Sequence, residues 1–212
     1  MSQPTLLKIY QSLLSAFGPQ HWWPANTAEE VIFGAILAQN TTWENAKRAI
    51  AALKNTENLS FKKIPTINLE ELADLIKSAR FLNQKAKALK AVADYLGNTY
   101  NFDIEKMKKK PLGKLREELL NLYRIGPETA DSILLYALEK PIFVIDAYTK
   151  RMFSQHGFMK SDDSYEAYQK FFMDNLPHNV QVYNEFHALI VHTGYLYCKP
   201  KPLCEECPLS HF

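Results

Sequence analysis

Signals for the start of an α-helix recur along the chain, and they constrain its fold more than any other feature of the sequence. Side chains suited to a helix N-cap or a first helical position stand at Thr27, Thr41, Asn68, Pro111 and Pro127. Each of the two threonines is followed three residues later by a glutamate, which is the spacing of a capping box. The chain has only 7 glycines, too few for the many tight turns of an all-β fold. The sequence therefore predicts an all-α protein.

Apolar residues recur at helical spacing between these signals. They predict helices over residues 31–37, 46–53, 69–76, 85–96, 111–120, 127–137, 147–156, 164–175 and 183–192. The helix over residues 85–96 is expected to stop before Gly97. The connections are short, and 212 residues suffice for one large or two small helical domains.

Net charge and hydropathy narrow the partners and the compartment. A net charge of +2 neither demands nor excludes nucleic acid, so any nucleic-acid binding would depend on a local patch. No apolar run approaches bilayer length, and the first residues lack the basic and apolar regions of a signal peptide. We therefore expect a cytoplasmic protein with no membrane partner. In that reducing compartment the three cysteines are expected to stay out of disulfides.

The stretch from Leu122 to Asp146 is the most informative for function. Gly126 can take a positive φ and Pro127 fixes the φ of a first helical residue, so a tight turn opens onto a helix. The amides of such a helix start can face an anion, although the same residues also suit an ordinary loop. After the next helix, Asp146 leaves an apolar run, where a carboxylate is costly to bury without a purpose.

This stretch resembles the helix-hairpin-helix and following loop of the endonuclease III (HhH-GPD) superfamily of DNA glycosylases. The residues that match the family's hairpin are Ile125, Gly126, Thr129 and Ala130. Asp146 stands at the interval of the family's catalytic aspartate. Further segments that resemble family motifs are residues 37–41, residues 81–86 and the C-terminal cysteines. The resemblance thus extends over most of the chain.

Within the superfamily, the chain is most similar to the 3-methyladenine DNA glycosylase III branch. The signatures of that branch are present as Trp22-Trp23-Pro24, Gln39-Asn40-Thr41 and Glu128-Thr129-Ala130-Asp131. The resemblance implies two helical domains of the endonuclease III type. Residues 25–140 would form a six-helix barrel with the hairpin, and residues 1–24 plus 141–212 a second helical domain with an iron–sulfur loop. It also implies a monomer whose partner is double-stranded DNA with a damaged base.

The resemblance gives Asp146 the catalytic role. Release of a base from deoxyribose passes through a cationic sugar, which a nearby carboxylate stabilises while it orients or deprotonates the attacking water. From the sequence alone, a helix N-cap is an equal alternative, because Asp146 precedes a helical segment. Glu128 stands where bifunctional members carry a lysine, and a carboxylate cannot form the Schiff base that strand cleavage needs. We therefore expect a monofunctional glycosylase.

Aromatic residues supply a candidate pocket for the base. An alkylated purine carries positive charge, so the ring faces of Trp22, Trp23 and Trp43 would attract it once it leaves the stack. Pro24 and Glu128 complete the expected pocket. The alternatives are that the tryptophans are core residues and that Glu128 only favours its helix N-terminus.

We expect removal of alkylated purines. Uracil, thymine or an oxidised pyrimidine are the alternative substrates. A non-catalytic helix-hairpin-helix DNA-binding protein is the alternative from another class.

Residues expected to contact DNA surround the hairpin, namely Gln39, Lys85, Arg124, Ile125, Gly126 and Thr129. Gln39 would fill the gap left by a flipped base, or is simply a polar residue at a helix end. Arg124 replaces the first glycine of the family's hairpin, so either its backbone takes an unfavourable positive φ or the turn differs. Arg124 and Lys85 can each add a phosphate contact.

All three cysteines lie near the C-terminal end of the sequence, as Cys198-x5-Cys204-x2-Cys207. Clustered thiolates in a cytosolic protein indicate a metal site. The resemblance implies a structural 4Fe–4S cluster; zinc is the alternative, and free thiols are a third reading. The family's spacing puts the fourth cysteine at position 213, so the fourth ligand lies beyond the sequence given, is His211, or comes from outside the chain.

Overall fold

The computed structural model describes residues 3–199 and 201–212. Within these residues every regular element is helical and none is a strand, which confirms the all-α prediction. None of the helices in the described ranges is both long and apolar enough to cross a membrane. The chain divides into two compact units, Met1–Pro24 with Pro141–Phe212 (unit 1) and Ala25–Lys140 (unit 2).

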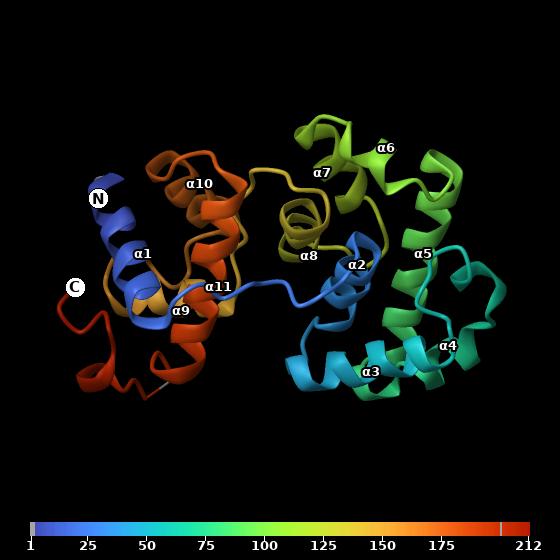
Figure 1. Ribbon diagram of the computed structural model, residues 1–212, viewed down its shortest axis with the longest axis horizontal. Helices are drawn as coiled ribbons and strands as arrows, with labels where there is room; N and C mark the ends of the chain where they lie inside the picture. Colours follow the sequence, from blue (N-terminus) through green and yellow to red (C-terminus); the bar gives the residue numbers. More distant parts are fainter. Residues whose placement is uncertain (1–2, 200) are drawn as a thin grey trace. The chain divides into compact units, whose positions relative to one another are not determined.

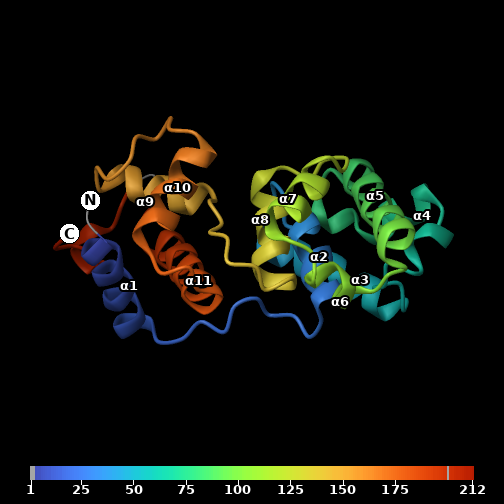
Figure 2. The same ribbon diagram turned by 90° about the horizontal axis from the view of Figure 1, so that it is seen from above.

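Unit 2 is built around the helix α2. The helices of this unit are α2 (Ala28–Leu37), α3 (Trp43–Asn55), α4 (Leu69–Leu75), α5 (Leu82–Tyr100), α6 (Ile104–Lys108), α7 (Leu112–Leu120) and α8 (Pro127–Ser132), which continues as a π-helix over Ile133–Ala137; short 3₁₀ turns cover Ile64–Thr66 and Lys77–Ala79. All of α2 from Glu30 onward is buried, and it packs against α3, α5 and the π-helix (Figures 1 and 2). Phe33 of α2 stacks on Phe61 with ring centroids 4.3 Å apart.

Unit 1 is centred on α11. Its helices are α1 (Gln3–Phe17), α9 (Ala147–Gln155), α10 (Tyr165–Asn175) and α11 (Val180–Leu196), with a 3₁₀ turn over Cys204–Glu206. In Figure 1, α11 lies beside α1 and α9, and both pairs are in contact. Phe143 stacks on Phe172 at 4.2 Å and meets Tyr183 edge-on. The apolar run before Asp146 is therefore part of this core.

Side-chain caps fix most helix starts. The predicted caps at Thr27 and Asn68 are confirmed, since each accepts a hydrogen bond from the amide three residues on. The predicted cap at Thr41 is wrong by one residue. Thr42 caps α3, whereas the Thr41 hydroxyl accepts from the Asn45 side-chain amide at 2.8 Å.

The end of α5 also differs from the prediction. The helix runs through Gly97 to Tyr100 and stops at Asn101, which takes a left-handed conformation. The Phe102 ring lies 2.7 Å from where a Cβ on Gly97 would be. Gly97 thus serves close packing inside the helix and does not end it.

Candidate active site and nucleic-acid interface

The hairpin between α7 and α8 turns at a different residue than the sequence predicts. Gly126 is the N-cap of α8 with extended backbone (φ −88°, ψ 178°), and Pro127 is the first helical residue. Arg124 instead has the positive φ, at +61°. The predicted positive φ at Gly126 is therefore wrong, and the strain of about 1 kcal/mol or more falls on an arginine.

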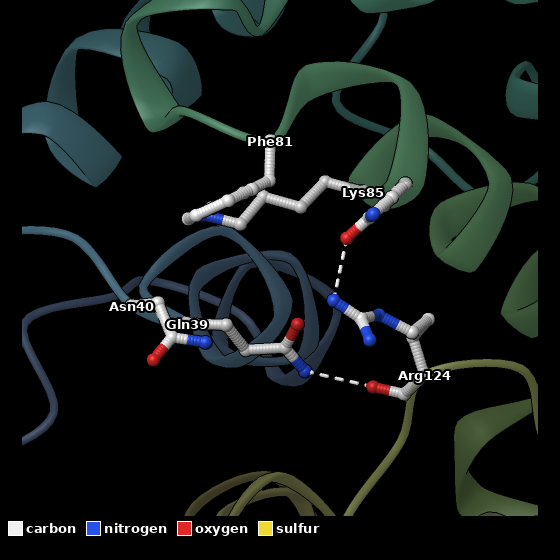
Figure 3. Close-up of a pocket in the computed structure, with 6 residues that line it drawn as sticks. Gln39, Asn40, Phe81, Lys85 and Arg124 are labelled. Atoms are coloured by element: carbon white, nitrogen blue, oxygen red, sulfur yellow. Dashed lines mark hydrogen bonds between the residues drawn. The ribbon is translucent and has the colours of Figure 1, made fainter.

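Gln39 is tied to this hairpin. Its side-chain Nε2 donates to the Arg124 carbonyl at 3.0 Å and to Thr129 Oγ1 at 2.9 Å. The Arg124 guanidinium donates in turn to Gln84 Oε1. Gln39, Gln84 and Arg124 line a small hollow, and Figure 3 shows the side chains that surround it. The structure thus brings the expected DNA contacts Gln39, Arg124 and Thr129 together, whereas Ile125 is buried.

Phe81 is a residue that the sequence did not single out as a DNA contact. It lines the same hollow, has a φ of +47°, and leaves 56% of its surface exposed. A large exposed apolar ring next to an arginine suits stacking on a base. Its exposure results from the turn before α5, which no local pattern in the sequence discloses.

Lys85 also lines this hollow, but its ammonium points to backbone carbonyls. The side chain is buried, and its ammonium donates to the Leu37 carbonyl at 2.9 Å and the Ala79 carbonyl at 2.5 Å. Burial lowers the pKa of Lys85 to about 8. The predicted phosphate contact is therefore not supported, and the lysine instead joins the end of α2 to the turn before α5.

Asp146 is the N-cap of α9. Its Oδ1 accepts hydrogen bonds from the Thr149 amide at 2.7 Å and from the Thr149 hydroxyl at 2.8 Å. The cap that the sequence offered as an alternative is thus present. It uses one oxygen only, so capping and chemistry are compatible at this residue.

The second oxygen of Asp146 faces a buried histidine. Oδ2 lies 3.7 Å from His187 Nε2 on α11. Burial lowers the pKa of His187, against the raising effect of the Asp146 carboxylate. The imidazole is therefore neutral near pH 7. His187 is not among the residues predicted from the sequence, because a single histidine in an apolar helix belongs to no recognisable motif.

Comparison with known proteins identifies the family. Residues 33–178 match the HhH-GPD superfamily of base excision DNA repair proteins. The chain belongs to the HhH-GPD superfamily.

Relatives of this HhH-GPD protein cover most of its length. A Methanocaldococcus jannaschii protein provisionally assigned as a DNA repair glycosylase is 46% identical over 98% of this chain and 94% of its own. Endonuclease III of Sulfolobus acidocaldarius is 30% identical over 85% of this chain and 79% of its own. The crystal structure of H. pylori 3-methyladenine DNA glycosylase bound to 1,N6-ethenoadenine has 29% identity and a TM-score of 0.79, covering 92% of this chain and 98% of that one.

The residues expected to line the base pocket belong to both units of the HhH-GPD fold. Trp22 and Trp23 are half-buried in unit 1, with ring centroids 5.4 Å apart, and Pro24 after them is exposed. Trp43 is the half-buried first residue of α3 in unit 2. Glu128 is exposed in the first turn of α8, where its charge also favours the helix dipole.

The three cysteines lie near one another without forming a ligand set. Cys198 is buried, and its Sγ is 2.8 Å from Gln155 Oε1. Burial raises the pKa of its thiol, Arg151 partly offsets this, and the charges of Cys207 and Cys204 raise it further. Among the described residues, no three His, Cys, Asp or Glu side chains are placed to hold a metal ion. In their chemistry, the three thiols fit ligands of a thiolate-bound group.

Proposed function

We propose that this base excision repair DNA glycosylase hydrolyses the N-glycosidic bond of alkylated purines in double-stranded DNA and leaves the strand uncut. The observation that carries the proposal is the geometry of Asp146. Thr149 fixes one carboxylate oxygen with two hydrogen bonds, so the other keeps a set direction. A preorganised charge of this kind stabilises a cationic transition state without reorganisation cost.

The reaction would need little acid catalysis. An alkylated purine is positively charged and leaves as a neutral base, while positive charge develops on the deoxyribose. The Asp146 carboxylate would stabilise that charge and then accept a proton from the water that attacks the sugar. A carboxylate and aromatic rings suffice for such a substrate, because cation–π attraction selects the charged base.

Glu128 is the residue that supports a reaction without strand cleavage. Lyase activity needs an amine that can form a Schiff base with the sugar, and a carboxylate cannot serve. The first turn of α8 presents Glu128 to solvent. We therefore expect the product to be an intact strand with an abasic site.

The residues at and around the hairpin between α7 and α8 would bind the DNA. Arg124 and the first turn of α8 would bind the phosphates, and no side chain caps that turn. Gln39, anchored to the hairpin, would fill the gap left by the flipped base, with Phe81 stacking on a neighbouring base.

A panel of damaged oligonucleotides tests the proposal. We expect release of 3-methyladenine, little release of uracil or thymine glycol, and no covalent adduct after borohydride treatment. Asp146→Asn should abolish release, by at least about 100-fold, while it keeps the cap on α9 and the melting temperature. Preferred release of a pyrimidine would contradict the substrate class. Release by Asp146→Asn at the wild-type rate would remove Asp146 from the mechanism.

We also propose that the cysteines bind a structural iron–sulfur cluster. Cys198, Cys204 and Cys207 would hold it, and its role would be to cross-link the end of unit 1. Iron analysis and visible absorbance of protein purified without oxygen test this, with Cys204→Ser expected to lose both signals. Zinc in place of iron, or no metal, would refute it.

A further inference from the structure

A buried imidazole lies behind the proposed catalytic carboxylate. His187 is 6% exposed, and its Nε2 lies 3.7 Å from Asp146 Oδ2. This separation exceeds a hydrogen bond, so the neutral imidazole leaves Oδ2 available to a reactant. The Phe143 ring meets His187 edge-on and holds it in the core of unit 1.

We propose that His187 is a positioning residue for Asp146. In its neutral form, the imidazole packs behind the carboxylate and keeps it in the direction in which it reacts. In its protonated form, the imidazole draws Oδ2 into an ion pair, which stops turnover. The proposal rests on the proposed function, since it presumes that Asp146 is catalytic. It adds a residue that contacts neither DNA nor base.

The groups around His187 show which charge can act on its imidazole. Asp146 faces it from the start of α9, and the Tyr165 hydroxyl on α10 accepts a hydrogen bond from the Ile145 amide. Tyr183 lies one turn earlier on α11, and its burial raises its pKa to about 12. From α1, Tyr10 packs on the residue next to His187, and burial raises its pKa too. Of these side chains, only Asp146 carries a charge between pH 5 and 8 that can act on the imidazole.

The sign of the pH effect follows from burial. Because burial lowers the pKa of His187, the imidazole charges only below the usual range of a histidine. Base release should therefore hold steady above about pH 6.5 and fall as the pH drops through the lowered pKa. The ionisation of His187 would then determine the acid limb of the pH–rate profile, the range in which base release falls as the pH is lowered.

Single-turnover release of 3-methyladenine from methylated duplex DNA tests this, with the enzyme-free rate subtracted at each pH. We expect His187→Leu to slow release between about 10- and 100-fold at pH 7.5 with DNA affinity unchanged. His187→Gln, which keeps a polar atom and cannot charge, should restore most of the rate and shift the acid limb. His192→Leu is the matched control, since His192 is on the same helix and packs on Phe17, 4.7 Å between ring centroids.

The outcomes separate the two proposals. Turnover by Asp146→Asn would overturn the proposed function and this inference with it. An inactive Asp146→Asn, together with a wild-type rate and acid limb in His187→Leu, would overturn the inference alone. If His187→Leu does not fold, the profile of His187→Gln decides, and an unchanged acid limb there refutes the role of His187.

Discussion

Arg124 has a strained backbone at the turn of the hairpin, where we propose that its side chain binds a phosphate. Its positive φ favours glycine, which the family's hairpin carries at this place, yet its side chain brings a positive charge to the turn. We expect Arg124→Gly to raise the free energy of unfolding by up to about 1 kcal/mol, because the strain is relieved. DNA affinity should fall, and the slope of log affinity against log salt should shrink by about one unit. Urea unfolding and binding titrations at several salt concentrations measure both.

Glu57→Gly is the control for this prediction. Glu57 has a φ of +56°, follows the end of α3 and pairs with Lys63, so its replacement should relieve strain without changing DNA affinity. If Arg124→Gly leaves the salt slope at the wild-type value, Arg124 makes no phosphate contact.

Lys85 should make the free energy of unfolding depend on pH. Its pKa is about 8 in the folded protein and about 10.4 in an unfolded chain, so between these values the unfolded state binds more protons. Stability from this group therefore rises as the pH rises through that window. The neutral amine keeps two N–H groups for its two carbonyl partners, so no hydrogen bond is lost.

The comparison with Lys85→Met isolates this effect. From pH 7 to 9.5, the wild type should gain about 2 kcal/mol relative to the variant, at about 1.4 kcal/mol per pKa unit. Urea unfolding at the two pH values measures the gain, and other titrating groups cancel in the difference. A constant difference would mean that Lys85 titrates normally.

At the scale of elements, Gly194 sets how closely α9 and α11 approach. A Cβ there would lie 2.6 Å from Tyr148 Cδ1 and 2.9 Å from Tyr148 Cβ, two residues after Asp146. Gly194→Ala should cost about 1–3 kcal/mol and slow base release, because α9 must shift together with its N-cap. Gly113→Ala in α7 meets no atom within 4 Å and should be neutral or slightly stabilising. Equal melting temperatures for the two variants would show that Tyr148 can move aside.

The same scale shows what local sequence can predict. Thr27 and Asn68 cap their helices as predicted, because a cap is an interaction between residues three apart. The end of α5 was misplaced, since Phe102 packing on Gly97 overrides the local preference of glycine. In the hairpin, the positive φ that the sequence predicts for Gly126 is found at Arg124 instead.

For the whole molecule, the hairpin and Asp146 could be found from the sequence, because each belongs to a continuous pattern. His187 and Phe81 could not, since burial beside Asp146 and exposure beside Gln39 arise only when distant helices pack. The predicted phosphate contact of Lys85 is not supported, for the converse reason. A lysine in a basic stretch gives no sign in the sequence that it is buried.

The two units give the last prediction, because each has an aromatic core of its own. Phe143 stacks on Phe172 in unit 1, and Phe33 stacks on Phe61 in unit 2. Phe143→Leu and Phe33→Leu should each cost about 1–3 kcal/mol. Hydrogen exchange should then rise mainly in peptides of the unit that carries the substitution. Phe143→Leu should also slow base release, since Phe143 holds His187 behind Asp146. Exchange that rises equally in both units would mean that a single core unfolds as one.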